Sequence, residues 1–356
     1  MVSQRVADRT EGNGDAGAMD KISEPVVLWM VLAMLAVCLS SRRAQAEDAW
    51  TVYGGAEGPG KGRHIVFVTG DEEYRSEESM PQIAKILAVH HGFTCIVLFA
   101  VNGDTGEIDP ETLDNIPGLE ALRTADLMVL FVRFRELPDE SMKYLMDYTN
   151  SGKPILALRT STHAFRYVKH PDNPYARYSF DSTAPAGGYG REVLGETWVA
   201  HHGMHRIEST RGVVAPGMED HPIVQGCEDI WGPSDVYALT TLTGDSQPLI
   251  MGHVLRGMDP GDSPNPDKKP LPVAWLKTYT GTQGKAARVF TTTMGHSFDV
   301  KSEGFRRLLV NACYWCLGME DRIPARSDVD IVGEYDPNDI GVGKHKRGVK
   351  PSDLAL

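Results

Sequence analysis

The stretch KPILALRTSTHAF, residues 153–165, decides the fold. Its apolar run ILAL stops abruptly at Arg159, which is typical of a buried parallel strand. Ligands of an open α/β sheet bind just beyond the carboxyl ends of such strands. Arg159, Thr160 and His163 therefore stand where an active site would be built, and polar side chains there are costly unless they are used. The alternative interpretation is a polar turn whose hydroxyls cap a following helix.

Strand-like and helix-like segments alternate on both sides of this stretch. Strands are predicted at residues 64–69, 94–99, 126–132, 248–256, 272–279 and 287–293, and helices at 76–91, 138–151 and 302–317. Such alternation implies a parallel sheet with helices on both faces. The sequence therefore predicts one doubly wound, mostly parallel α/β domain of flavodoxin-like type over residues 62–320.

Four of the predicted strands end in polar side chains. These are Asp71 and Glu72 after the first strand, Arg133 and Arg135 after the third, Arg159, Thr160 and His163 after the fourth, and His296 after the last. The carboxyl ends of parallel strands meet at one edge of a sheet, so these groups predict a pocket there. A buried guanidinium needs an acceptor. We expect the end of the first strand to supply it to Arg159.

A second group of polar residues follows a long loop. Residues 166–195 are rich in proline and glycine and predict a functional loop or lid. His201, His202 and His205 come directly after it and can be carried over the pocket. In the first chemical interpretation, His163, His202 or His296 is the general acid or base, and Arg159 holds an oxyanion.

The second interpretation is a metal site. His201 or His202 together with His205 would bind zinc with a carboxylate from the end of the first strand, Asp71 or Glu72. The third interpretation is that these histidines are ordinary hydrogen-bonded structure. The sequence leaves the three open, with no cofactor expected and zinc as the alternative.

Several common motifs are missing from the chain. It has no GxSxG or GxCxG elbow, no P-loop, and no GxGxxG after a strand, so ATP and NAD are not expected. Its one CxxC pair, Cys313 and Cys316, ends a predicted amphipathic helix, and we interpret both as core residues rather than a redox or zinc pair.

The two ends of the chain differ from the predicted domain. Residues 26–39 are an apolar run followed by Ala-Gln-Ala, which predicts a secretory signal peptide over residues 1–46, with Met19 as a possible start. An uncleaved membrane anchor is the alternative. Residues 47–61 are expected to be a linker and residues 321–356 an extended tail, packed on this domain or on a second copy in a homo-oligomer. The expected location is secreted or periplasmic.

The charge of the chain limits its partners. The formal net charge is −12 at pH 7. An acidic surface argues against binding to nucleic acid and to anionic membranes. A small molecule is the expected partner, and membrane contact is expected only through an uncleaved leader.

Five stretches together resemble the ThuA-like (trehalose-utilisation) family, over about residues 62–324. They are VTGDEEYRSEE, LALRTSTHAF, LGETWVAHHGMH, EDHPIVQG and GKAARVFTTTMGHSFD. The resemblance implies a class I glutamine amidotransferase-like fold and a carbohydrate-linked role. Related amidotransferases carry a nucleophilic cysteine at the elbow where this chain has Arg159 and Thr160, so a working glutamine amidotransferase is not expected.

The resemblance leads to one functional expectation with two alternatives. The expectation is an enzyme that hydrolyses or isomerises a sugar or keto-sugar derivative. The alternatives are a non-catalytic sugar-binding protein and a zinc-dependent hydrolase. Besides the catalytic candidates, the residues expected to bind substrate are Asp71, Glu72, Arg133, Arg135, Thr160, His201 and His205.

Overall fold

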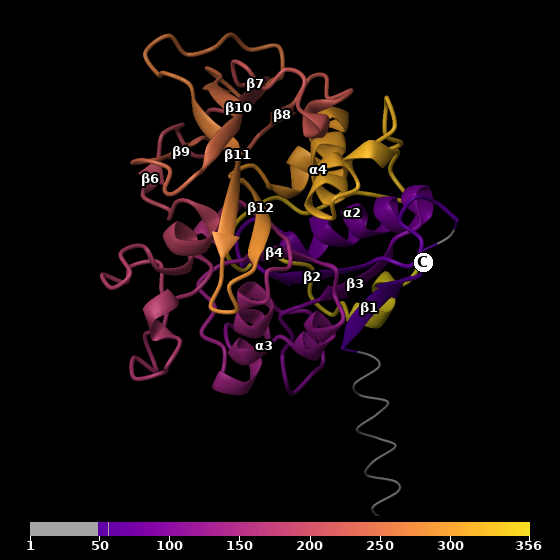
Figure 1. Cartoon of the computed structure of the whole chain (residues 1–356), viewed down its shortest axis with the longest axis vertical. Helices are drawn as coiled ribbons and strands as arrows, with labels where there is room; N and C mark the ends of the chain where they lie inside the picture. Colours follow the sequence, from indigo (N-terminus) through magenta and orange to yellow (C-terminus); the bar gives the residue numbers. More distant parts are fainter. Residues whose placement is uncertain (1–48, 56) are drawn as a thin grey trace, which may run out of the picture. The chain divides into compact units, whose positions relative to one another are not determined.

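A computed structural model describes residues 49–55 and 57–356 of the protein. The predicted signal peptide lies outside these residues. The described chain is built on one ten-stranded sheet with the strand order β1-β3-β2-β4-β5-β12-β11-β10-β7-β8 (Figure 1). The strands are β1 (Trp50–Tyr53), β2 (His64–Gly70), β3 (Thr94–Leu98), β4 (Leu127–Val132), β5 (Ile155–Leu158), β7 (Thr210–Val214), β8 (Trp231–Gly232), β10 (Gln247–Val254), β11 (Leu271–Thr280) and β12 (Ala286–Thr292).

The sheet is mixed, which corrects the expectation of a mostly parallel one. Strands β3, β2, β4, β5 and β12 pair in parallel, through four of the nine strand pairings. The other five pairings, which bring in β1, β11, β10, β7 and β8, are antiparallel. The short connection between β11 and β12 explains part of the difference, because a tight hairpin joins antiparallel strands only.

Helices cover both faces of the parallel part of the sheet. Side chains alternate along β2, so that Ile65 and Phe67 face one apolar core and Val66 and Val68 face the other. Helices α2 (Ser76–His91) and α4 (Glu303–Cys316) contribute to the first core, and α3 (Asp139–Asn150) contributes to the second. In Figure 1, α2 and α4 lie above these strands and α3 lies below them.

The predicted helices form where the sequence placed them. Helix α2 begins at Ser76, whose hydroxyl accepts from the N–H groups of Gly70 and Asp71, and ends at Gly92, which has the left-handed φ of 78° that favours glycine. Cys313 and Cys316 are buried in α4, as predicted, and burial raises the pKa of Cys316 to about 12. Among the described residues, no helix is long and apolar enough to cross a bilayer.

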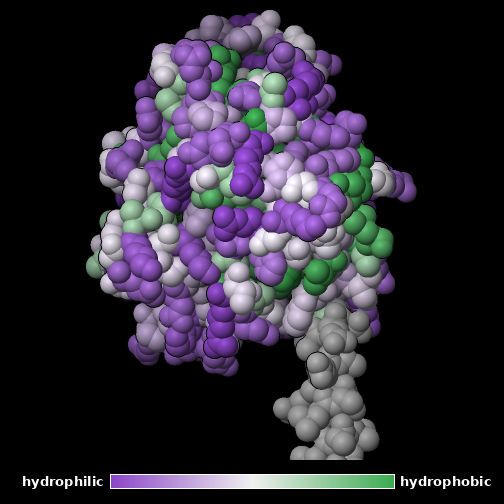
Figure 2. Space-filling model, turned by 45° about the vertical axis from the view of Figure 1, so that its right-hand side comes forward, coloured by the Kyte–Doolittle hydropathy of each residue, from purple (hydrophilic) through white to green (hydrophobic). Residues whose placement is uncertain are grey.

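The segments on either side of the central domain are part of the same body. Strand β1 pairs with β3 inside the range expected to be a linker. The tail runs back over the domain, with Val329 and Ile340 buried in the core around α2. Figure 2 shows a face on which hydrophilic residues dominate and apolar residues lie in small separate groups.

Short elements complete the chain. A two-stranded sheet joins β6 (Ala200–His201) to β9 (Tyr237–Ala238). One-turn helices lie at Leu119–Arg123, Arg159–His163, Ala176–Tyr178, Pro222–Val224, Ser297–Lys301, Glu320–Arg322 and Pro351–Leu354, and a π-helical turn lies at Gly190–Leu194. The expected loop at residues 166–195 therefore contains two of these short turns.

Candidate functional site

The polar strand ends meet as predicted, because β2, β4, β5 and β12 are parallel neighbours in the sheet. At the end of β2, Asp71 Oδ1 accepts from the N–H groups of Glu73 and Tyr74 at 2.7 and 2.6 Å. The hydroxyl of Thr160 donates to Asp71 Oδ2 from the end of β5. Asp71 and Thr160 are both buried, so they fix the two strand ends to each other rather than face a ligand.

The carboxylate of Glu72 is also paired with groups of the protein. It forms ion pairs with Arg133 and, at 3.1 Å, with Arg135. Arg135 is completely buried, and its other N–H groups donate to the backbone carbonyls of Arg133, Thr112 and Pro110. Among the candidates at these strand ends, Arg133 keeps some exposure, at 20% of its side chain.

Arg159 is the buried centre of the site. Its guanidinium lies between the rings of Tyr74 and Tyr237, 4.2 Å from each centroid. Nη2 donates to Asp235 Oδ1 at 2.7 Å, and Nη1 donates to the carbonyls of Asp235 and Thr293. The expected partners at the end of β2 were therefore wrong. Because the side chain is 0% exposed, Arg159 positions Asp235 and does not hold a substrate oxyanion.

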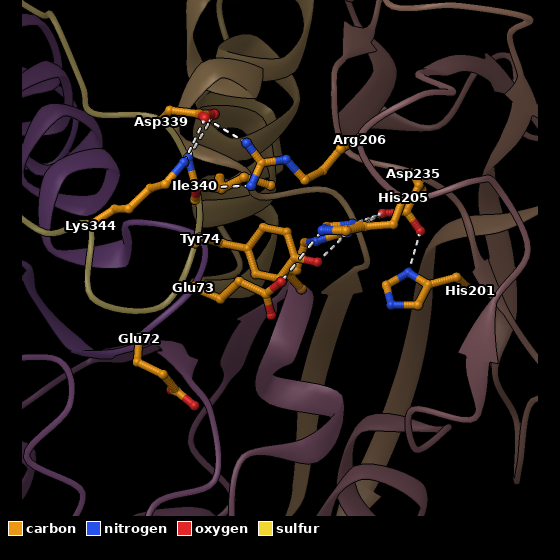
Figure 3. Close-up of polar contacts among 12 residues, drawn as sticks. Glu72, Glu73, Tyr74, His201, His205, Arg206, Asp235, Asp339, Ile340 and Lys344 are labelled. Carbon is orange, nitrogen blue, oxygen red and sulfur yellow. Dashed lines mark hydrogen bonds and ion pairs between the residues drawn. The ribbon is translucent and has the colours of Figure 1, made fainter.

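Asp235 in turn joins two of the predicted histidines. Its Oδ2 lies 2.6 Å from His201 Nδ1, and its Oδ1 lies 3.1 Å from His205 Nδ1. Burial alone would raise the pKa of Asp235, but Arg159 and the two imidazoles hold it well below its usual range. An ionised carboxylate that accepts from Nδ1–H leaves the lone pair of an imidazole on Nε2, where it can take part in chemistry. Figure 3 shows both rings beside Asp235.

A carboxylate on the opposite side also approaches His205. Glu73 Oε1 lies 3.5 Å from His205 Nε2, and Glu73 Oε2 lies 3.3 Å from Arg133 Nη2. His205 therefore lies between Asp235 and Glu73 (Figure 3), whereas His201 is paired with Asp235 alone and is 37% exposed. The two imidazoles share one carboxylate but have different second neighbours.

The other predicted histidines have separate places. His202 is not part of the cluster, because its Nε2 contacts the carbonyl of Lys269. His296 begins the turn Ser297–Lys301, and its Nδ1 accepts from the N–H of Phe298 at 2.9 Å. Burial and, secondarily, Arg159 lower the pKa of His296 to about 3. His163 is buried among aromatic rings.

A cavity of about 130 Å³ lies beside His205 and His296. Its lining also includes Tyr74, Arg206, Pro233, Ser234, Asp235, Met258, Asp339 and Ile340. The last two belong to the tail, which crosses here as a strap, defined as residues 338–344. Arg206 attaches the strap by pairing with Asp339 at 2.6 Å (Figure 3). The N–H of Gly341 attaches it a second time by donating to the carbonyl of Glu73.

The sequence did not point to Asp235, Glu73 or the strap. Asp235 lies in WGPSDVYAL, between the very short strands β8 and β9, so no periodic pattern marks it. Glu73 is one of five acidic residues in GDEEYRSEE, and nothing in that run separates it from its neighbours. Only the folded chain shows which carboxylate reaches the histidines.

The same residues form a candidate metal site. One ligand atom from each of His201, His205 and Asp235 lies within 4.8 Å of the others. In the present geometry the 2.6 Å separation of His201 Nδ1 and Asp235 Oδ2 is that of a hydrogen bond. If zinc bound through Nε2 of these histidines, Asp235 would be the carboxylate that orients both rings.

Comparison with known proteins gives structural likenesses only. No family model and no curated protein matches the sequence. A "Putative thua-like protein" from Bacteroides uniformis is 15% identical with a TM-score of 0.44, over 73% of this chain and 93% of that one. A protein of the same description from Parabacteroides merdae is 14% identical with a TM-score of 0.45, over 83% of this chain and 100% of that one.

A third solved structure that is similar is the IFT52 N-terminal domain, 12% identical with a TM-score of 0.38, over 71% of this chain and 96% of that one. Two of the three bear the name of the family that the sequence motifs resemble. All three TM-scores lie below 0.5, so these likenesses say nothing of what this chain does.

Proposed function

We propose that the protein is a ThuA-like enzyme that acts on a sugar or keto-sugar derivative by moving protons between substrate and the pair His201 and His205. One observation carries the proposal: a single buried carboxylate, Asp235, contacts Nδ1 of both rings. A carboxylate in this position fixes the tautomer and orientation of an imidazole and stabilises the imidazolium that forms during proton transfer.

The two histidines suit different roles. His201 is the more exposed ring and has Asp235 as its carboxylate partner, which makes its Nε2 the candidate base. His205 lies within ion-pair distance of both Asp235 and Glu73, and two carboxylates stabilise its protonated form, which makes it the candidate acid. An acid and a base side by side serve both isomerisation of a keto-sugar, by shifting a proton between neighbouring carbons, and hydrolysis, by activating water.

The contacts of the elbow residues and the burial of the cysteines support proton transfer more than covalent catalysis. The elbow after β5 holds Arg159 and Thr160, and both are committed to buried contacts with carboxylates. Cys95, Cys313 and Cys316 are buried in the core, and burial raises the pKa of each thiol. Cys227 is half-buried, and burial raises its pKa to about 12. The committed elbow residues and the raised thiol pKa values favour acid–base chemistry at His201 and His205 over a thiol nucleophile.

The test compares two neighbouring histidines. Keto-disaccharides and their parent sugars are incubated with the wild type, with His201→Ala and with His202→Ala, and products are followed by NMR. Loss of a general base lowers the rate by about 10²- to 10⁴-fold. We expect that loss for His201→Ala and near-wild-type rates for His202→Ala. Sugar binding without turnover by the wild type would instead favour a non-catalytic binding protein.

A zinc-dependent hydrolase is the second candidate function, favoured by the clustering of His201, His205 and Asp235. Elemental analysis of protein purified without added metal and without a histidine tag is the test. Stoichiometric zinc that is absent from a His201→Ala/His205→Ala double variant would support it. An active, metal-free wild type would exclude it.

The proposed location is outside the cytoplasm. Its basis is the apolar run at residues 26–39 followed by Ala-Gln-Ala. N-terminal sequencing of protein from the cell envelope should give Glu47 as the first residue. A product that still contains residues 26–46 would mean a membrane anchor instead.

A further inference from the structure

A group of aromatic rings surrounds His163 outside the two apolar cores. The centroids of Phe134, Trp198 and Phe180 lie 5.2, 5.4 and 6.0 Å from the centroid of the His163 ring. All three are half-buried and none belongs to either core cluster of the described residues. We call Phe134, His163, Phe180 and Trp198 the aromatic subsite. Grouped aromatic rings that leave part of their surface to solvent are enriched at binding sites.

The aromatic subsite adjoins the proposed catalytic pair. The ring of Trp198 lies 5.9 Å from that of His201, in an edge-to-face arrangement. The backbone N–H of Trp198 and the hydroxyl of Thr197 donate to the carbonyl of Thr162, at 3.4 and 3.1 Å. These hydrogen bonds attach the end of the long loop to the turn that follows β5. A molecule stacked on Trp198 would therefore lie next to His201.

The backbone at Phe134 is held in an unfavourable conformation. Its φ is 52°, and its N–H donates to the carbonyl of His163 at 3.1 Å. A bulky residue with positive φ costs on the order of 1 kcal/mol or more, and such strain persists where surrounding structure enforces it, often at functional sites. Here it places the ring of Phe134 against His163 directly after β4.

The hydrogen bonds of Thr162 fix the tautomer of His163. The Thr162 hydroxyl donates its one proton to the carbonyl of Arg159 at 3.1 Å, so at 3.2 Å from His163 Nδ1 it acts as the acceptor. Burial, followed by the charges of Arg133 and Arg159, lowers the pKa of His163 well below its usual range. The ring is therefore neutral, with its proton on Nδ1 and a lone pair on Nε2.

His163 Nε2 has no partner in the protein. It makes no hydrogen bond among the described residues, and His163 as a whole is 3% exposed, so a ligand can approach this atom only narrowly. A lone acceptor framed by aromatic faces is suited to a hydroxyl group whose carbon skeleton lies against those faces. The arrangement asks for a ligand that is apolar on one face and carries hydroxyls at its edge.

Charge narrows the choice of ligand further. The guanidinium of Arg133 lies 4.4 Å from the centroid of Phe134, and that of Arg166 lies 5.7 Å from the centroid of Phe180. These cations would repel a second cation, so the subsite is unsuited to the ammonium ligands that aromatic cages often bind. No cation lies over the ring of Trp198 within the described residues, which leaves it for stacking.

We propose that the aromatic subsite binds the ring of a sugar that carries no positive charge, with one face of the pyranose stacked on Trp198 and a hydroxyl donating to His163 Nε2. This deepens the proposed function and rests on it, because it places a sugar bond or carbonyl next to His201. The C–H groups on one face of a pyranose carry partial positive charge and meet the negative face of the indole ring.

The experiment measures binding apart from turnover. Trehalose, cellobiose and methyl α-glucopyranoside are the probes, with sorbitol as an acyclic polyol that has hydroxyls but no ring face. Saturation-transfer NMR and calorimetry are run on the wild type, Trp198→Ala, Trp198→Phe, His163→Phe and Tyr175→Ala. Tyr175 is the matched control, a half-buried aromatic of the same long loop that packs toward the α3 core instead. Unchanged circular dichroism shows that each variant folds.

The expected pattern separates stacking from hydrogen bonding. Trp198→Ala should weaken binding of the ring sugars by about tenfold, and Trp198→Phe should restore most of it. His163→Phe keeps an aromatic surface but loses the acceptor, so we expect a loss of about three- to tenfold. Sorbitol should not bind detectably, and Tyr175→Ala should bind as the wild type does.

Two results would overturn the inference. One is ring-sugar binding that Trp198→Ala leaves unchanged, and the other is failure of all three ring sugars to bind the wild type at tens of millimolar. Failure of the proposed function looks different: the wild type would bind ring sugars through Trp198 yet turn over none of them.

Discussion

Nη2 of Arg159 donates to Oδ1 of Asp235 across 2.7 Å, and the two side chains are 0% and 1% exposed. The pair links the end of β5 to the short segment between β8 and β9. This segment lies far from β5 in the sequence. Through Asp235 it also sets the positions of His201 and His205. Stability and proton transfer therefore depend on the same buried contact.

Removing the cation of this pair should destabilise the fold. Arg159→Ala leaves Asp235 buried without its counter-charge, which costs about 3–5 kcal/mol of unfolding free energy. The control is Arg166→Ala, which breaks an exposed pair with Asp181 and should change stability by less than about 0.5 kcal/mol. Urea unfolding measures both. Equal stability of the two variants would mean that the buried pair contributes nothing specific.

Neutralising the anion should affect catalysis and the acid stability of the protein. Because the pKa of Asp235 is lower in the folded than in the unfolded chain, its contribution to stability is present above the unfolded value and is lost as pH falls below it. Asp235→Asn removes this contribution and the charge that orients both imidazoles. We expect turnover to fall by about 10²-fold or more, and the stability difference from the wild type to shrink between pH 5 and pH 2 in urea titrations. A difference that is constant over this range would contradict the assignment.

The parallel half of the fold and the edge that carries the site were predictable for a specific reason. Runs such as ILAL at β5 are apolar on both faces, and each ends in polar side chains at one edge of the sheet. The strand ends therefore met where expected. In the antiparallel half, β10 and β11 were predicted as strands but not their direction. Strands β7 and β8 were missed because they are short, and residues such as Arg211 and Gly212 give β7 no clean alternation.

The partners within the site were not predictable, since they depend on which loop crosses which strand. Of the two carboxylates expected to face Arg159, Glu72 is paired with Arg133 and Arg135, and Asp71 accepts from Thr160. Asp235 replaces them from a segment without regular pattern. His201 and His202 are adjacent in the sequence but point in opposite directions, as neighbouring side chains of an extended segment do. His201 contacts Asp235, and His202 contacts the carbonyl of Lys269.

A pH-dependent prediction concerns Glu77, in the first turn of α2. Burial raises the pKa of Glu77 to about 8, and Arg75 Nη1 at 3.3 Å lacks the geometry of a hydrogen bond to it. A carboxyl whose pKa is higher in the folded chain contributes stability below its unfolded value, near 4.5, and loses it as pH rises toward 8.

Glu77→Gln should therefore be more stable than the wild type at pH 8 and similar to it at pH 4. Thermal unfolding across this range measures the difference. Glu320→Gln is a suitable control, since Glu320 is paired with Arg288 at the surface and its pKa is shifted in the opposite direction. If Glu77→Gln is destabilising at pH 8, the Arg75 ion pair outweighs burial.

The last prediction concerns the strap, residues 338–344, which forms one wall of the cavity beside His205. The pair between Arg206 and Asp339 is exposed, at 43% and 50% of the side chains, so it adds at most about 1 kcal/mol to stability. Its position matters more, because it ties the tail to the loop that carries His205.

Asp339→Ala should raise KM for a sugar substrate several-fold while kcat and the unfolding midpoint stay close to those of the wild type. It should also speed proteolytic cleavage within the strap. Arg326→Ala, which removes exposed pairs elsewhere in the same tail, should change none of these. If Asp339→Ala lowers kcat and leaves KM unchanged, the strap acts on the histidines themselves rather than on access to the cavity.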